Sequence, residues 1–199
     1  MYVNLRRYPA TTAAKGEIAR SVRDDLLPVL REQAGFEAYC AFRDSEGAGI
    51  SVTVFADGEC AAGATDAARR WVLRHREFFP ERGEEFAGAC IAHAAGASSP
   101  ELPYVLVREL TGMPGTQDTL AFVQQRTLPM ITRSPGFGAV YTVRGDRDGR
   151  RAAVVTLFDS EAHALACHEQ AVELLREGLP GATVARVLHG RSTVFALKP

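Results

Sequence analysis

The sequence contains an internal repeat, and the two copies keep their landmarks in the same order. The stretch "AGFEAY" begins at Ala34 and "PGFGAVY" begins at Pro135, each a few residues after a Leu-Pro pair. The recurring pairs are Tyr2-Val3 and Tyr104-Val105, Leu27-Pro28 and Leu128-Pro129, Gly35-Phe36 and Gly136-Phe137, and Val54-Phe55 and Leu157-Phe158. A period of about a hundred residues is the length of one small domain. We therefore predict two copies of one fold, residues 1–95 and 104–199. The linker between them, 96–103, lies in the small, polar and proline-containing stretch "AAGASSPELP".

The first copy shows a regular alternation of strand and helix patterns. "YVNLRRY" alternates as a strand does, and the next residues place Ile18, Val22, Leu26 and Leu30 on one helical stripe. Two β-rich runs, "FEAYCAFR" and "ISVTVF", then flank a hairpin loop. A helix over 57–76 and a strand at "FAGACIAHA" complete the copy. The predicted order is βαββαβ, which is the ferredoxin-like arrangement.

The second copy predicts the same order of elements. It reads as "YVLVREL", a helix over 116–132, "FGAVYTVR", "AAVVTLF", a helix over 160–177, "TVARVLHG" and a separate short strand "STVFAL". A sheet with helices on one face needs a cover for its other face, and two such sheets can cover each other. The predicted fold class is therefore α+β, with two ferredoxin-like βαββαβ repeats forming an intramolecular α+β barrel. Pro28 and Pro129 lie inside the first helix of their copies, where we expect a kink with a packing role.

Composition narrows the kinds of partner that we expect. The formal net charge is −1 and the pI is near 6.5, so neither nucleic acid nor an anionic membrane is an expected partner. The first residues lack a signal peptide's apolar core and no stretch is long enough to span a bilayer, which predicts a cytoplasmic protein. The four cysteines form no CxxC pair and no zinc spacing, so we expect no metal. A small hydrophobic or aromatic molecule remains. Because one chain supplies both halves of the barrel, we expect a monomer.

The two copies differ most in the polarity of one sheet face. Alternate residues of the first strand are Tyr2, Asn4, Arg6 and Tyr8 in the first copy, and Tyr104, Leu106, Arg108 and Leu110 in the second. The strand after the Gly-Phe pair carries Glu37, Tyr39 and Arg43 in the first copy, and Gly138, Val140 and Arg144 in the second. Covered polar groups need hydrogen bonds or water. The face therefore either lines a small-molecule cleft or forms a hydrated barrel seam in which the arginines pair with Glu37.

Together these patterns resemble the dimeric α+β barrel superfamily, and within it the antibiotic biosynthesis monooxygenase-like (ABM) branch. The stretches that carry the resemblance are "LREQAGFEAY", "SVTVFADGECAAGATDAARRWV", "TLPMITRSPGFGAVY" and "VVTLFDSEAHALA". The resemblance implies a fused version of the family's dimer. The family includes cofactor-independent quinone-forming oxygenases, haem-degrading enzymes, isomerases and members without known activity, so the fold alone does not name a reaction.

The resemblance implies a cofactor-independent monooxygenase acting on a small aromatic or quinone-like compound in the N-terminal half. In that interpretation Arg6 or Arg43 stabilises a substrate anion, Asn4 and Tyr39 orient it, and His75 or Glu37 takes the proton. Tyr2 joins Glu37 and Arg43 as a substrate-binding candidate. The alternative is a non-catalytic small-molecule-binding or stress-associated barrel.

A third interpretation is a haem-binding or haem-degrading protein, and flavin also stays open as a cofactor. Trp71, the single tryptophan, and His75 lie one helical turn apart. Together with Asn4 they resemble the residues that line the site of the haem-degrading branch, although there the histidine lies farther beyond the tryptophan. The simpler alternative makes Trp71 a core residue and His75 a half-buried helix histidine.

Overall fold

The structure is a computed structural model that describes residues 1–9, 11–97, 100–145 and 149–198. Two residues of the predicted linker, 98 and 99, lie outside the described residues. The elements of the first copy are β1 (Tyr2–Tyr8), α1 (Lys15–Ser21), the π-helical turn η1 (Val22–Leu26), α2 (Leu27–Arg31), β2 (Phe36–Arg43), β3 (Gly49–Phe55), α3 (Gly58–Arg74) and β4 (Glu84–Ala95).

The second copy repeats this order. Its elements are β5 (Tyr104–Thr111), α4 (Thr116–Phe122), the π-helical turn η2 (Val123–Thr127), α5 (Leu128–Arg133), β6 (Phe137–Gly145), β7 (Ala152–Phe158), α6 (Glu161–Gly178) and β8 (Thr183–Leu197). One expectation was wrong. "TVARVLHG" and "STVFAL" form the single strand β8, because Gly190 and Arg191 stay in the ladder opposite Val105 and Tyr104 instead of forming a turn.

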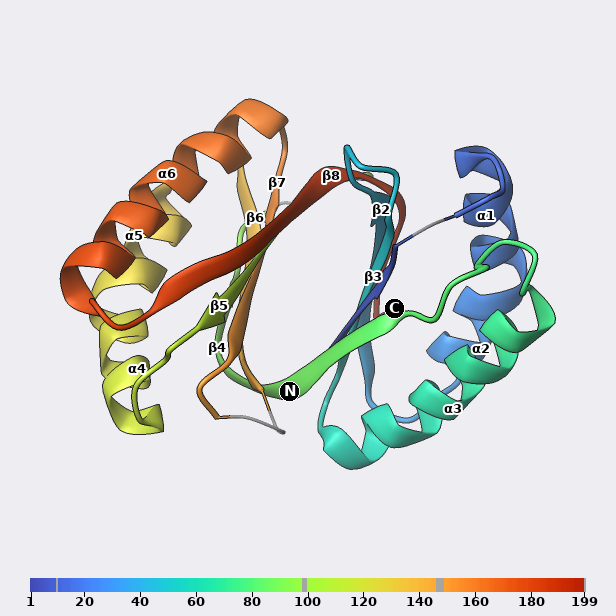
Figure 1. Cartoon of the computed structure of the whole chain (residues 1–199), viewed down its shortest axis with the longest axis horizontal. Helices are drawn as coiled ribbons and strands as arrows, with labels where there is room; N and C mark the ends of the chain where they lie inside the picture. Colours follow the sequence, from blue (N-terminus) through green and yellow to red (C-terminus); the bar gives the residue numbers. More distant parts are fainter. Residues whose placement is uncertain (10, 98–99, 146–148, 199) are drawn as a thin grey trace. The chain divides into compact units, whose positions relative to one another are not determined.

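The strands belong to two compact units. Unit 1 is Met1–Ala89 with Ser192–Pro199, and unit 2 is Cys90–Arg191, so β4 and β8 each contribute to both units. In unit 1 the order is β4-β1-β3-β2-β8, with α1, α2 and α3 on one face of the sheet (Figure 1). In unit 2 the order is β8-β5-β7-β6-β4, with α4, α5 and α6 on one face. The hydrogen-bonded order β1-β3-β2-β8-β5-β7-β6-β4 closes the eight strands into an antiparallel barrel, and the predicted α+β class is confirmed.

The core of unit 1 lies between the helices and the sheet. Helix α3 begins after Asp57, whose side chain accepts a hydrogen bond from the backbone N–H of Cys60 and caps the helix. Its small residues let it approach the strands closely, and Trp71 provides the bulk at its far end. The buried side chains of this core come from α3 and the preceding helical segments, and from the sheet; they include Leu26, Leu30, Phe36, Tyr39, Phe55, Ala64, Ala68 and Trp71.

A π-helical turn precedes each of the two repeated prolines. The backbone N–H of Leu27 donates to Val22 O, and that of Leu128 donates to Val123 O, five residues back in each case. A π turn inserts one extra residue, which displaces the carbonyl that the following proline ring would otherwise approach. The structure thus accommodates Pro28 and Pro129 by widening the preceding turn.

The repeated Gly-Phe pairs mark equivalent turns. Gly35 and Gly136 have φ angles of 71° and 69°, in the region that favours glycine. Their carbonyls accept hydrogen bonds from Ala56 and Asp159 at 2.7 and 2.9 Å, just after β3 and β7. A Cβ at Gly136 would lie 2.1 Å from Asp159 Oδ1. The Gly-Phe pair is therefore part of the scaffold in both units.

Candidate functional site

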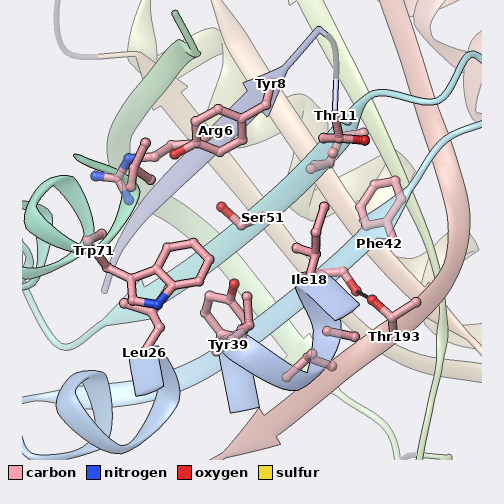
Figure 2. Close-up of a pocket in the computed structure, with 18 of the residues that line it drawn as sticks. Arg6, Tyr8, Thr11, Ile18, Leu26, Tyr39, Phe42, Ser51, Trp71 and Thr193 are labelled. Carbon is pink, nitrogen blue, oxygen red and sulfur yellow. Dashed lines mark hydrogen bonds between the residues drawn. The ribbon is translucent and has the colours of Figure 1, made fainter. Parts of the chain in front are cut away.

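Unit 1 holds a cavity of about 70 Å³ between the helix-facing side of its sheet and the helices. Its lining is mainly apolar and comes from the strands, α1, η1, α2 and α3. Figure 2 shows the Tyr39 hydroxyl pointing toward Ser51, beside the indole of Trp71. The polar residues of the lining are Arg6, Tyr8, Thr11, Tyr39, Arg43, Ser51, Thr53, Trp71 and Thr193.

Strand register places these polar residues on one face of the sheet. Thr53 lies opposite Asn4 on one side and Tyr39 on the other, so the three form a row across β1, β3 and β2. The next row contains Arg6 and Ser51. Because side chains alternate along a strand, both rows face the helices. The strand register thus places Asn4, Arg6 and Tyr39 on one face of the sheet, as the alternation predicted.

Two buried polar groups of the cavity lining have no hydrogen-bond partner among the described residues. They are the indole N–H of Trp71 and the hydroxyl of Thr53, and the Tyr39 side chain lines the cavity with them. Each of these side chains is 3% exposed. Burial raises the pKa of the Tyr39 phenol, so this group stays protonated and able to donate. An unmet buried polar group costs about 1–3 kcal/mol, which makes this set a candidate ligand-binding surface.

Arg6 and Asn4 are engaged by protein atoms. Arg6 Nη2 lies 3.0 Å from Glu85 Oε1 on β4 and 3.1 Å from Thr65 Oγ1 on α3. Asn4 Nδ2 donates to the same Thr65 oxygen at 3.2 Å, and Thr65 in turn donates to Ala61 O. Arg6 lines the cavity, whereas Asn4 does not. The network fixes α3 on the sheet, and Asn4 cannot orient a substrate in the cavity because it does not line it.

Arg43 lines the cavity but has a structural partner. Its Nη2 donates to Ala13 O at 2.9 Å, just before α1. The equivalent Arg144 of unit 2 donates to Pro114 O at 2.7 Å, just before α4. The same bond in both copies indicates that these arginines hold the start of the first helix. Tyr8, at the same end of the cavity, stays a phenol because burial raises its pKa.

His75 does not line the cavity. It ends α3 as the C-cap residue, and its ring lies against Trp71 with centroids 4.5 Å apart. Its Nδ1 is 2.9 Å from Trp71 O and its Nε2 is 3.1 Å from Ser21 Oγ. Trp71 and His75 are close, as their spacing predicts, but only Trp71 reaches the cavity, because the last turn directs the histidine toward α1.

Glu37 and Tyr2 also lie outside the cavity lining. A register shift between Phe36 and Ala38 removes Glu37 from the alternation, and its carboxylate pairs with Lys198 Nζ at 3.2 Å. The predicted pairing of the arginines with Glu37 was wrong for Arg6, whose partner is Glu85. The Tyr2 ring packs near Gly58 at the start of α3.

The cavity includes residues that the sequence analysis did not single out. Thr53 and Ser51 face the cavity from β3, and Thr65 and Glu85 hold the side chain of Arg6 by hydrogen bonds. The alternation of "ISVTVF" contains the two hydroxyl residues at positions of one parity, which is a signal that could have found them. No local pattern links Glu85 to Arg6, since that contact depends on the pairing of β1 with β4.

Two further features bear on what the chain can hold. Within the described ranges, no three His, Cys, Asp or Glu side chains gather in a way that could bind a metal ion. None of the helices in these ranges has the length and apolar character that crossing a bilayer requires.

Comparison with known proteins establishes the fold. No protein-family model matches the chain, and no curated protein matches it in sequence. A "putative monooxygenase" from Fusobacterium nucleatum superposes with a TM-score of 0.78 at 9% identity, covering 99% of this chain and 94% of that one. A "putative monooxygenase" from Lactobacillus acidophilus superposes with a TM-score of 0.74 at 7% identity, covering 99% of this chain and 96% of that one. An anthrone oxidase-like protein superposes with a TM-score of 0.60 at 12% identity, covering 99% of this chain and 93% of that one. The chain therefore has the dimeric α+β barrel fold, as the resemblance predicted.

The geometry of unit 1 does not fit a haem. Both ring nitrogens of His75 are within hydrogen-bond distance of protein atoms, and the Asn4 amide is bound to Thr65. The cavity of about 70 Å³ is also well below the roughly 300–1,000 Å³ of sites that hold drug-sized ligands and cofactors. Asn4, Trp71 and His75 thus do not form the haem site that the resemblance implied.

Proposed function

We propose that unit 1 binds a small phenol and oxidises it with molecular oxygen, without a bound cofactor. The observation that carries this proposal is the pair of unpartnered buried polar groups, on Thr53 and Trp71, in a mainly apolar cavity that Tyr39 also lines. The apolar walls suit an aromatic ring, and the polar groups suit its oxygen. The names of structural neighbours, two of them monooxygenases and one anthrone oxidase-like, agree with this class of reaction.

The size of the cavity favours a single aromatic ring. A cavity of roughly 150 Å³ binds benzene in an engineered protein. The cavity here is about 70 Å³, so even one ring requires small shifts of the lining side chains. We therefore propose a substituted monocyclic phenol as the ligand, in preference to a larger polycyclic compound.

The lining favours the anionic form of such a phenol. Tyr39 and Trp71 can donate hydrogen bonds, and the guanidinium of Arg6, although paired with Glu85, also lines the cavity. Electron transfer from a phenolate to oxygen, followed by oxygen addition to the ring, gives a para-quinone. The overall change is one phenol and one O₂ to one quinone and one water. Since neither His75 nor Glu37 lines the cavity, the phenol proton leaves to water.

A non-catalytic binding protein is the second candidate. The observation that favours it is the nature of the titratable groups in the described part of the cavity lining, which are two arginines and two tyrosines. None of them is a general base near neutral pH. The same pocket would then bind the phenol and leave it unchanged.

Trp71 fluorescence provides the binding test, because the only tryptophan lines the cavity. We expect a monocyclic phenol to change its emission saturably. Tyr39→Phe should weaken binding of the phenol about threefold to tenfold, the equivalent of one hydrogen bond. Binding of toluene should not change, because it has no oxygen. Tyr141→Phe, the same substitution on β6 of unit 2, is the control. Equal losses for phenol and toluene would contradict the role of the Tyr39 hydroxyl.

Oxygen uptake separates the two candidate functions. Protein dialysed against a chelator is mixed with methyl- or methoxy-substituted phenols, while dissolved oxygen and quinone absorbance are followed. The oxidase proposal expects oxygen and quinone to change in a ratio of one to one. Saturable fluorescence changes without oxygen uptake would establish the binding protein instead, and the absence of both signals would contradict both.

We also propose that the protein is a monomer, since the eight strands of one chain already close a barrel. Light scattering coupled to size exclusion should give a mass near 21.5 kDa at all concentrations. A mass of twice that value that persists on dilution would contradict the proposal.

A further inference from the structure

Unit 2 contains a buried arginine without an acidic partner. Arg108 on β5 is 3% exposed. Its Nε donates to His168 Nδ1 at 3.2 Å, and its Nη2 lies 3.9 Å from Cys167 Sγ. Its Nη1 has no hydrogen-bond partner among the described residues, and none of them gives Arg108 an ion pair with a carboxylate. The guanidinium keeps its charge, since arginine does not lose its proton in proteins.

The internal duplication shows what is missing. Arg6 occupies the equivalent position in unit 1, where its strand neighbour on β4 is Glu85. The strand neighbour of Arg108 on β8 is Val187. Unit 2 therefore keeps the buried cation of unit 1 and has a valine where unit 1 has the anion.

The nearby polar groups do not compensate for this charge. Burial, and then the charge of Arg108, lower the pKa of His168, so the imidazole is neutral and accepts the Nε hydrogen bond. A buried charge with no counter-ion costs several kcal/mol. An anion supplied from outside the chain would remove most of that cost.

A cavity of about 40 Å³ lies beside Arg108 within unit 2. Apart from two threonines, the rest of its lining is apolar, and it includes Leu110, Met113, Phe122, Val154 and Leu175. One water needs roughly 10–15 Å³ of such volume, so the space suits a carboxylate group with one or two carbon atoms. A carboxylate also matches the planar fork of a guanidinium.

We propose that unit 2 binds a short-chain monocarboxylate, with its carboxylate on Arg108 Nη1 and its apolar tail against the cavity wall. The site is separate from the phenol cavity of unit 1 and does not depend on the function proposed there. It lies in the copy that has the less polar sheet face.

Thermal unfolding of the full chain with propionate tests the site. We expect a saturable rise in Tm of about 2–6 °C at constant ionic strength, the result of a ligand that binds only the folded state. Propionamide, which has the same shape and no charge, should have no effect, and neither should sodium chloride. An equal response to propionate and propionamide, or no response to propionate, would overturn the proposal.

Two variants locate the effect. Arg108→Met removes the cation, and Val187→Glu supplies the carboxylate that unit 1 carries at the matching position. Both should abolish the rise in Tm with propionate, and Val187→Glu should also raise Tm without ligand. Glu109→Gln, on the same strand, should keep the full response. A rise that persists in both Arg108→Met and Val187→Glu would place the binding elsewhere and refute the assignment.

Discussion

Replacing Glu85 by valine is expected to lower the free energy of unfolding by about 2–4 kcal/mol. The side chain of Arg6 is 10% exposed and that of Glu85 is 26% exposed, so the pair is largely removed from water. Without the carboxylate, the Arg6 side chain keeps only Thr65 as a hydrogen-bond partner among the described residues of unit 1. We expect a smaller loss of unfolding free energy than for a fully buried ion pair, because Glu85 is partly solvated. Urea unfolding followed by circular dichroism measures it.

Two further variants test the cause of this loss. Adding Arg6→Met to Glu85→Val removes the charge that was left alone, so the double variant should be more stable than Glu85→Val. Glu84→Val breaks the neighbouring pair with Arg7, in which the glutamate side chain is 49% exposed, and should cost less than about 1 kcal/mol. Equal losses for Glu84→Val and Glu85→Val would mean that burial of the pair is not what matters.

Replacing Trp71 by alanine is expected to lower the free energy of unfolding by about 3–5 kcal/mol. Its side chain is buried in the core of unit 1, where it contacts Phe79 with ring centroids 5.8 Å apart. The substitution removes both this packing and the wall between the core and the cavity. Trp71→Phe keeps an aromatic ring, so it should cost clearly less in the same urea experiment.

Added indole should restore part of the stability of Trp71→Ala. The lost side chain leaves a space that joins the existing cavity, and an apolar ligand that fills it binds only the folded state. We expect indole to raise the Tm of this variant. Leu175→Ala, which makes a cavity in unit 2, should respond less because the space it leaves is smaller and lies elsewhere. Identical responses of the two variants would show that indole acts nonspecifically.

The hydrophobic periodicity of the sequence and its internal repeat predicted most of the scaffold. The strands "YVNLRRY", "FEAYCAFR" and "AAVVTLF" have the bounds of β1, β2 and β7, because alternation and flanking turn residues are local signals. The Gly-Phe pairs and the repeated prolines also mark equivalent turns in both units. What the pattern could not indicate is that each proline follows a π-helical turn, since that depends on one extra residue in the hydrogen-bond register.

The candidate site was predictable only in part. Alternation placed Arg6 and Tyr39 on the cavity face, and helical spacing placed Trp71 toward the sheet. Strand alternation failed for Glu37, because a bulge at the start of β2 breaks the period of two. Helical spacing failed for His75, because α3 ends at this residue. The partners of Arg6 come from α3 and β4, far away in the sequence, so no local pattern specifies them.

The path of β8 has a consequence for how the chain reaches its native state. Thr193 donates a hydrogen bond to Ala41 O, a contact across 152 positions, and Ser192–Leu197 forms the strand beside β2. During synthesis, the edge of β2 thus stays unpaired until the end of the chain is available, whereas unit 2 is built from a continuous segment. Contacts between residues so distant in sequence form late and slowly. The half that is translated first is therefore the half whose sheet is completed last.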